Sequence, residues 1–184
     1  MIDLPLPRGH IWLRLTQPHY EDPFDTSYAQ RQGGRWNPPD SWPTLYLNED
    51  LLTVHAQLRH LFAGRGIDPA DVDDDAPIML AAATLPQRQR AADVVSDAGV
   101  TAVGLPATYP VDAAGEAVGH DRTQPIGVEA HHSGLRGVWC RSAAGAGQEL
   151  AWFPATRSRA RPAWPAPLPY GSWRHATSLG ELVG

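Results

Sequence analysis

The sequence predicts an α+β fold in which mixed, largely antiparallel sheets combine with short helices. Short apolar runs bounded by Gly, Pro and Asn are typical of strands, and several occur along the chain. Two of them, 135–141 and 148–153, are separated by a small loop and therefore predict a hairpin. The segment 49–63 instead repeats its apolar residues at the spacing of a helix. The 184 residues amount to one ordinary domain that is long enough to bury a sizeable core.

The first part of the chain combines strands with an irregular loop. A first strand is expected around 11–15, followed by loop residues. The segment 33–43 is so rich in Gly, Pro and Asn that it predicts an irregular loop. The residues 44–47 alternate as in a strand, so their two leucines share one face while Tyr46 lies on the other.

The segment 49–63 predicts an amphipathic helix with Asn48 as its N-cap. The acidic residues at its start suit the positive charge of a first helical turn. Gln57 lies about 90° from the centre of the apolar stripe, so we expect it at the edge of the helix, where a side chain can face a cleft. The stripe itself consists of Leu51, Val54, Leu58, Leu61 and Phe62.

The second half of the chain alternates regular and irregular segments. Strands are expected at 78–85 and 92–95, and the Gly- and Pro-containing segment 101–122 is expected to be irregular. A short helix is predicted at 124–133, starting near Pro125 because proline is best tolerated in a first turn. The predicted hairpin then completes the pattern.

The chain divides by composition into a domain and a tail. Residues 1–153 are predicted to form the domain, and 154–184, rich in Pro, Arg and Trp, a C-terminal strap or tail with little core of its own. Trp164, Tyr170 and Trp173 are the side chains expected to pin this strap onto the body.

The charges of the chain exclude several functions. A net charge of −5 without a basic stripe argues against direct binding of nucleic acid. All 15 basic residues are Arg, which excludes a Walker lysine, a pyridoxal Schiff base and a Ser-x-x-Lys nucleophile. Anions must therefore be held by guanidinium or backbone N–H groups.

A single cysteine and the absence of long apolar runs indicate the compartment. Cys140 alone provides neither an intrachain disulfide nor a thiolate zinc site, which fits a reducing environment. Residues 1–15 have no long apolar run after a basic patch, so we expect no signal peptide. No stretch approaches the roughly 20 apolar residues of a membrane helix. We therefore expect a cytoplasmic protein without a membrane partner.

We expect no metal site. The acidic run 71–75 starts like a calcium loop but continues with Ala76 and Pro77 instead of the glycine that the loop needs. The neighbouring His131 and His132 point in different directions and are expected to be ordinary surface or capping residues.

The segment Gly33-Gly34-Arg35-Trp36-Asn37 has the composition of a ligand-binding loop. Adjacent glycines let the backbone approach a ligand closely, and Arg35 has the fork geometry that suits a diphosphate. Trp36 offers a flat apolar wall, and Asn37 is placed to orient the loop. The alternative is a rigid turn with Trp36 in the core and Arg35 in a salt bridge.

This segment, the strand that follows and the helix after it resemble the opening of the RES domain. In that family a Gly-Gly-Arg-Trp-Asn-Pro motif precedes a short strand with Tyr and then a helix. The later segments 123–127 and 134–143 resemble the family's helix, Gly-x-x-Gly turn, strand and Ser-Ala ending. The resemblance extends over residues 11–153, and its first motif is the more specific.

The resemblance implies an ADP-ribosyltransferase-like fold and a toxin of a bacterial toxin–antitoxin pair. Such toxins degrade NAD by hydrolysis or phosphorolysis, and some transfer ADP-ribose to a protein; no metal is needed. A small antitoxin neutralises them. By position, the residues that would contact NAD or take part in its cleavage are Arg14, Arg35, Trp36, Asn37, Tyr46, Gln124 and Ser142.

One position departs from the family pattern. The family has a catalytic Glu eleven residues after the strand Tyr, and here Gln57 stands in its place. Gln57 keeps the hydrogen bond to a ribose hydroxyl but loses the negative charge that offsets the oxocarbenium-like state. Two hypotheses follow: an NAD-cleaving enzyme, or a catalytically impaired module that binds NAD, ADP-ribose or a partner protein. An interaction domain that uses the Trp-rich tail as a strap is a third.

Each site residue also has a structural interpretation. Arg14 can pair with a surface acid, Tyr46 can be a half-buried strand residue, and Ser142 can cap the hairpin turn. Gln57 can be solvated, and Cys140 is expected to be a small core residue rather than a nucleophile, because no base has a fitting spacing.

Overall fold

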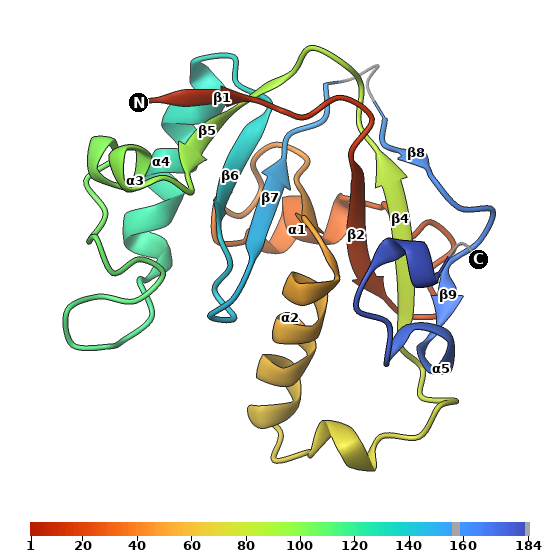
Figure 1. The fold of residues 1–184 in the computed structure, drawn as a ribbon. Helices are drawn as coiled ribbons and strands as arrows, with labels where there is room; N and C mark the ends of the chain where they lie inside the picture. The colour runs from red at the N-terminus through yellow and green to blue at the C-terminus, as the bar shows by residue number, and fades with distance from the viewer. Residues whose placement is uncertain (156–158, 183–184) are drawn as a thin grey trace.

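The computed structural model describes residues 1–155 and 159–182. The described residues form one sheet of nine strands in the order β1-β5-β6-β7-β3-β2-β4-β8, with β9 also on β4 (Figure 1). Only the β5–β6 pair is parallel within this sheet. The strands are β1 Asp3–Pro5, β2 Ile11–Thr16, β3 Leu45–Asn48, β4 Met79–Thr84, β5 Arg90–Val94, β6 Gly137–Arg141, β7 Gln148–Trp152, β8 Arg161–Pro162 and β9 Leu168–Pro169.

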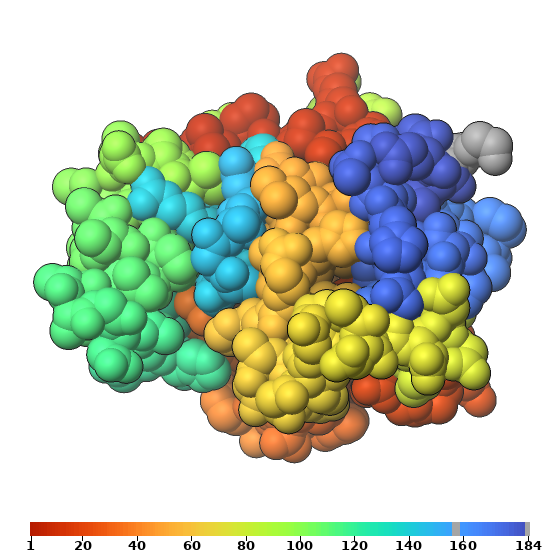
Figure 2. Space-filling view, turned by 60° about the horizontal axis from the view of Figure 1, so that its bottom comes forward, coloured from red at the N-terminus to blue at the C-terminus, as the bar shows by residue number. Residues whose placement is uncertain are grey.

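Short helices cover this sheet, as expected for the predicted α+β fold. Figure 2 shows α2 at the centre of one face, between the β6–β7 hairpin and the C-terminal segment. The helices are α1 Ser27–Gln32, α2 Leu51–Ala63, α3 Asp97–Ala102, α4 His120–His132 and α5 Tyr170–Trp173, with the 3₁₀ turns η1 Pro69–Asp71 and η2 Leu179–Glu181.

The pairing of β3 decides which side chains share a face of the sheet. Tyr46 lies opposite Ala151 and Asn48 lies opposite Glu149 on β7, so these four side chains point to one face. Leu13 of β2 lies opposite Asn48 and therefore shares that face. The antiparallel β6–β7 pair confirms the predicted hairpin.

Three apolar clusters hold the sheet and helices together. One packs α3 and α4 against β5, β6 and β7 around Trp36, and a second packs α2 and α5 against β2 and β4 around Leu13. Both lie on the face that Tyr46 and Asn48 share. The third, which contains Trp12, Leu45 and Leu47, lies on the opposite face. The alternation predicted for the β3 leucines is therefore confirmed.

The structure confirms α2 but corrects two details. Asp50 is the N-cap rather than Asn48, because its Oδ1 accepts a hydrogen bond of 2.8 Å from the Thr53 backbone N–H. Asn48 instead completes β3 and is buried. Leu61, expected in the core stripe, is 44% exposed because the second cluster is already covered by Leu58 and Phe62.

Other boundaries also differ from those expected. Helix α4 starts at His120, four residues before the predicted start, with Pro125 inside it. A proline there removes only the one hydrogen bond to the carbonyl of residue 121, and the packing of α4 outweighs this loss. Helix α3 is capped by the Ser96 side chain, and neither α3 nor α1 was predicted, because six residues are too few for a clear apolar period.

The C-terminal segment packs onto the edge of the sheet. Strands β8 and β9 pair with β4, and Tyr170 and Trp173 are buried in the second cluster, with Trp164 packed against it. The expected pinning by these three aromatic side chains is confirmed. Residues 156–158 and 183–184 of the predicted strap lie outside the described residues.

Candidate active site

Tyr46 holds the Gly-Gly-Arg-Trp-Asn segment through its hydroxyl. The Trp36 backbone N–H donates to this hydroxyl at 3.0 Å, and the hydroxyl donates to Asn37 Oδ1 at 2.8 Å. Asn37 Nδ2 in turn donates to the Ala29 carbonyl at 2.7 Å. Burial raises the pKa of Tyr46, so the phenol stays neutral and serves as donor and acceptor at once.

Helix α4 holds the same segment from the other side. Gln124 Nε2 donates to the carbonyls of Gly34 at 3.0 Å and of Asn37 at 3.3 Å. A Cβ at Gly34 would collide with the Tyr46 ring and hydroxyl, so only glycine permits this approach. We call Gly34, Trp36, Asn37, Tyr46 and Gln124 the loop clamp.

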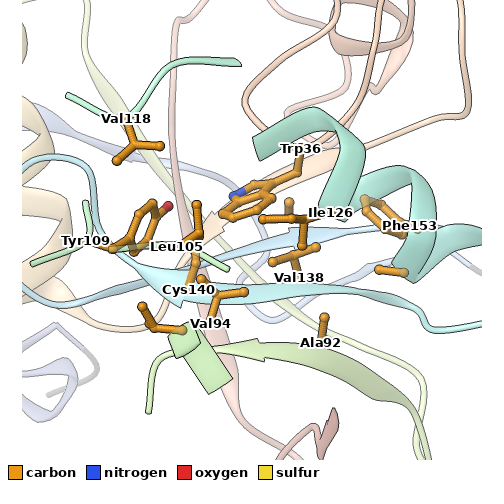
Figure 3. Close-up of a cluster of buried hydrophobic side chains, with 13 residues drawn as sticks. Trp36, Ala92, Val94, Leu105, Tyr109, Val118, Ile126, Val138, Cys140 and Phe153 are labelled. Atoms are coloured by element: carbon orange, nitrogen blue, oxygen red, sulfur yellow. The ribbon is translucent and has the colours of Figure 1, made fainter. Parts of the chain in front are cut away.

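The Trp36 side chain anchors the loop clamp in the core. Its indole is 1% exposed and points into the first cluster between Tyr109 and Ile126 (Figure 3). A Cβ at Gly127 of α4 would collide with the Trp36 carbonyl, so helix and loop are in direct backbone contact. The structure therefore has Trp36 in the core, as the structural interpretation proposed.

Arg35 has one buried side-chain nitrogen without a hydrogen-bond partner in the described residues, and its charge lies near the phenols of Tyr46 and Tyr109. Its Nη1 is buried, and so is the Tyr109 hydroxyl; within residues 1–155 and 159–182 neither atom has a hydrogen-bond partner. Burial raises the pKa of both Tyr46 and Tyr109, and the Arg35 charge lowers it again; a weak side-chain contact with Arg35, outside hydrogen-bond geometry, also lowers the pKa of Tyr109. A buried donor without a partner is costly, so this nitrogen is suited to an anionic ligand.

The residue at the position of the family Glu faces the sheet. Gln57 is half-buried, and its Oε1 accepts a hydrogen bond of 3.0 Å from Asn48 Nδ2. Asn48 Oδ1 is buried and has no partner in the described part of the chain. One turn earlier on α2, Thr53 Oγ1 accepts from the Gln148 backbone N–H at 3.1 Å, which fixes this face of the helix over β7.

Ser142 is joined to a carboxylate that the sequence analysis did not select. Its hydroxyl donates to Glu149 Oε1 at 2.6 Å and accepts from the Ala144 backbone N–H at 3.1 Å, so it also caps the hairpin turn. The signal for Glu149 was present in the alternation of β7, but using it required the register between β7 and β3. We call Asn48, Gln57, Ser142 and Glu149 the polar strip.

Arg14 lies apart from these groups. It is one of the residues that line a pocket of about 470 Å³ at the end of β2. Its Nη1 donates to the Asp25 carbonyl at 3.2 Å. Burial lowers the pKa of Arg14, while the Asp25 charge raises it. In the described residues no hydrogen bond joins Arg14 to the loop clamp or the polar strip. The structure thus brings seven of the eight predicted site residues around one part of the sheet and leaves Arg14 in the neighbouring pocket.

Cys140 is a core residue. It is 1% exposed, and burial raises the pKa of its thiol to about 12, which keeps it protonated and unreactive. Among the described residues, no three His, Cys, Asp or Glu side chains converge as metal ligands would. The same residues include no helix with the length and apolar character to cross a membrane.

Comparisons with known proteins agree on family and fold. The sequence model of the RES domain matches residues 11–172. A chain in the crystal structure of the M. tuberculosis MbcT–MbcA toxin–antitoxin complex superposes with a TM-score of 0.68 at 19% identity, covering 94% of this chain and 90% of that one. This similarity confirms the predicted mixed, largely antiparallel α+β fold. Comparison with curated proteins finds no match.

Proposed function

Because this chain belongs to the RES-domain family, we propose that it is a toxin-like enzyme that degrades NAD by cleaving the bond between nicotinamide and ribose. The observation that carries this proposal is the buried Nη1 of Arg35, which has no partner in the described residues although the loop around it is fixed by hydrogen bonds. Such a preorganised guanidinium suits a diphosphate.

Two further buried polar atoms fit the rest of a dinucleotide. The Tyr109 hydroxyl is a further donor, and Asn48 Oδ1 is an acceptor for a ribose hydroxyl; each lacks a partner within the described residues. We assign diphosphate binding to Arg35 and stacking of the nicotinamide to the Tyr46 ring. Ser142 supports the ribose end of the site through its hydrogen bond to the Glu149 carboxylate.

The remaining predicted residues have supporting roles in this proposal. Trp36, Asn37 and Gln124 fix the backbone on which Arg35 stands. Arg14, in the neighbouring pocket beside β2, binds the part of NAD that extends away from the loop clamp. The protein works in the cytoplasm and is neutralised by an antitoxin, as the name of the similar complex suggests for its own toxin.

The chemistry needs charge placement rather than a strong nucleophile. When the bond between ribose C1′ and the nicotinamide nitrogen breaks, both electrons stay with the nitrogen and neutralise its charge. The ribosyl group becomes oxocarbenium-like. A water or a phosphate then forms the new bond at C1′, and the water's proton passes to the solvent. The site must hold the diphosphate and stabilise the positive ribose.

The direct test is release of nicotinamide from NAD. The purified chain is incubated with NAD, with and without phosphate, and the products distinguish hydrolysis from phosphorolysis. Arg35→Ala is expected to raise KM at least tenfold, because a charge-assisted bidentate contact is lost. Arg59→Ala, on the exposed side of α2, is the matched control with unchanged kinetics. Absence of nicotinamide release at high enzyme concentration would contradict the proposal.

A second candidate is a module that binds NAD or ADP-ribose, or a partner protein, without turnover. Gln57 favours it, because an uncharged amide stands where the family has its carboxylate. Calorimetry that finds NAD affinity, together with turnover only after Gln57→Glu, would support this second candidate. Absence of NAD affinity would contradict both candidates.

A further inference from the structure

A carboxylate lies in the site although position 57 lacks one. Glu149 is directly opposite Asn48 in the antiparallel β3–β7 pair, and such residues have Cβ atoms about 4.5–5.5 Å apart on the same face. The Asn48 side chain also contacts Gln57, with 3.0 Å between Nδ2 and Oε1. Glu149 and Gln57 therefore flank the same asparagine.

We propose that Glu149 supplies the carboxylate for NAD cleavage, in place of the acid that the family resemblance puts at position 57. The negative charge thus comes from strand β7 instead of helix α2. This inference rests on the proposed function and adds a catalytic residue to it. The ligand group that Glu149 contacts is the nicotinamide ribose.

The hydrogen bonds of Glu149 leave one of its oxygens for a ligand. Ser142 donates to Oε1 at 2.6 Å. Within the described residues Oε2 accepts no hydrogen bond, and the side chain is only half-buried. Ser142 is 1% exposed and held by the hairpin turn, so it fixes the carboxylate in one orientation. This is the arrangement of a positioned acid with an open acceptor.

Glu149 and Arg35 act on the same groups with opposite signs. Burial is the main cause that raises the pKa of Tyr46, Tyr109 and Cys140; the Glu149 charge raises each further, and the Arg35 charge lowers each. No ion pair joins Arg35 and Glu149 in the residues described. Both charges therefore lie within electrostatic range of the phenols without neutralising each other, one suited to the diphosphate and one to the cationic ribose.

The carboxylate has a defined part in the reaction. As the C1′–nitrogen bond breaks and its electron pair leaves with nicotinamide, Glu149 offsets the positive charge on the ribose and accepts a hydrogen bond from a ribose hydroxyl. In hydrolysis, the attacking water forms the C1′–O bond and gives its proton to Glu149, from which it passes to the solvent.

Exchanging the carboxylate between the two positions tests the inference. Glu149→Gln is expected to lower kcat by about 10²–10³-fold, with little change in KM and in thermal stability. In the Glu149→Gln background, Gln57→Glu is expected to recover at least tenfold of the lost kcat. Glu49→Gln is the matched control. It also replaces a carboxylate by an amide next to Asn48, but Glu49 has no role in the proposed site.

Ser142→Ala separates catalysis from support of the hairpin. If Glu149 served only to hold Ser142, Ser142→Ala would reproduce the whole loss of Glu149→Gln, and Gln57→Glu would not rescue it. We expect instead that Ser142→Ala loses less kcat than Glu149→Gln. A Glu149→Gln variant that keeps more than a third of the kcat would overturn the inference.

The same variants separate this inference from the proposed function. Turnover by Gln57→Glu with an inactive natural chain would refute the role of Glu149 and leave the NAD site intact. If the natural chain, Gln57→Glu and the double variant all neither bind nor cleave NAD, both proposals fail.

Discussion

The loop clamp and the polar strip lie on one face of the sheet but use their polar groups differently. In the loop clamp, the Trp36 backbone N–H, the Asn37 side chain and the Tyr46 hydroxyl are all paired internally. In the polar strip, Asn48 Oδ1 has no partner in the described part. Most of the recognisable motif is therefore a scaffold, and the unpartnered buried atoms of the site are Arg35 Nη1 within that motif and Asn48 Oδ1 on β3.

The first prediction concerns the largest side chain of the loop clamp. Trp36→Ala is expected to lower the free energy of unfolding by about 3–5 kcal/mol, since it leaves a large cavity in the first cluster. Urea denaturation measures this loss. Leu52→Ala is the near-neutral control, because the Leu52 side chain is 56% exposed. A loss below about 1 kcal/mol would mean that the indole is not a core residue. The loop clamp would then not be a scaffold.

The second prediction tests whether the clamp depends on one hydroxyl. Tyr46→Phe leaves the Trp36 backbone N–H and Asn37 Oδ1 without their partner. Because both groups are buried, the free energy of unfolding should fall by about 1–3 kcal/mol. Hydrogen exchange at the Trp36 amide should accelerate by more than the global change in stability explains. Unchanged exchange would show that the loop is held without Tyr46.

The third prediction moves to the polar strip, where the same kind of truncation should matter less to folding. Gln57→Ala removes one hydrogen bond to Asn48 from a half-buried position, so the free energy of unfolding should change by about 0.5–1 kcal/mol. Denaturation next to Tyr46→Phe measures the difference between the two regions. An equal or larger loss for Gln57→Ala would make the strip a scaffold as well.

The sequence predicted the clamp better than the strip for a physical reason. The residues from Gly33 to Tyr46 are close in the chain, and glycine spacing with strand alternation predicts their local geometry. Glu149 lies opposite Asn48 because of the register between β3 and β7. A single sequence does not reveal this register. Arg14 was expected to contact NAD by resemblance, but strand alternation puts it on the face of β2 opposite Leu13, where it donates to the Asp25 carbonyl.

The smallest predicted effect is the response of the clamp to alkaline pH. Burial raises the folded-state pKa of Tyr46 above the unfolded value, so the folded state keeps its proton while the unfolded state begins to lose one near pH 10. The contribution of Tyr46 to the free energy of unfolding is therefore fully present below that pH. It falls as the pH rises, by about 0.4 kcal/mol at pH 10. Burial raises the pKa of Tyr109 in the same way.

Tyr46→Phe isolates this contribution, because it removes the proton but leaves Tyr109 in place. Between pH 8 and pH 10.5, the free energy of unfolding of the natural chain should fall more steeply than that of Tyr46→Phe. Denaturation curves at several pH values, with exposed Tyr28→Phe as the control, measure the two slopes. Equal slopes would mean that the Tyr46 hydroxyl ionises in the folded state as readily as in water, which the paired hydroxyl of a fixed clamp does not allow.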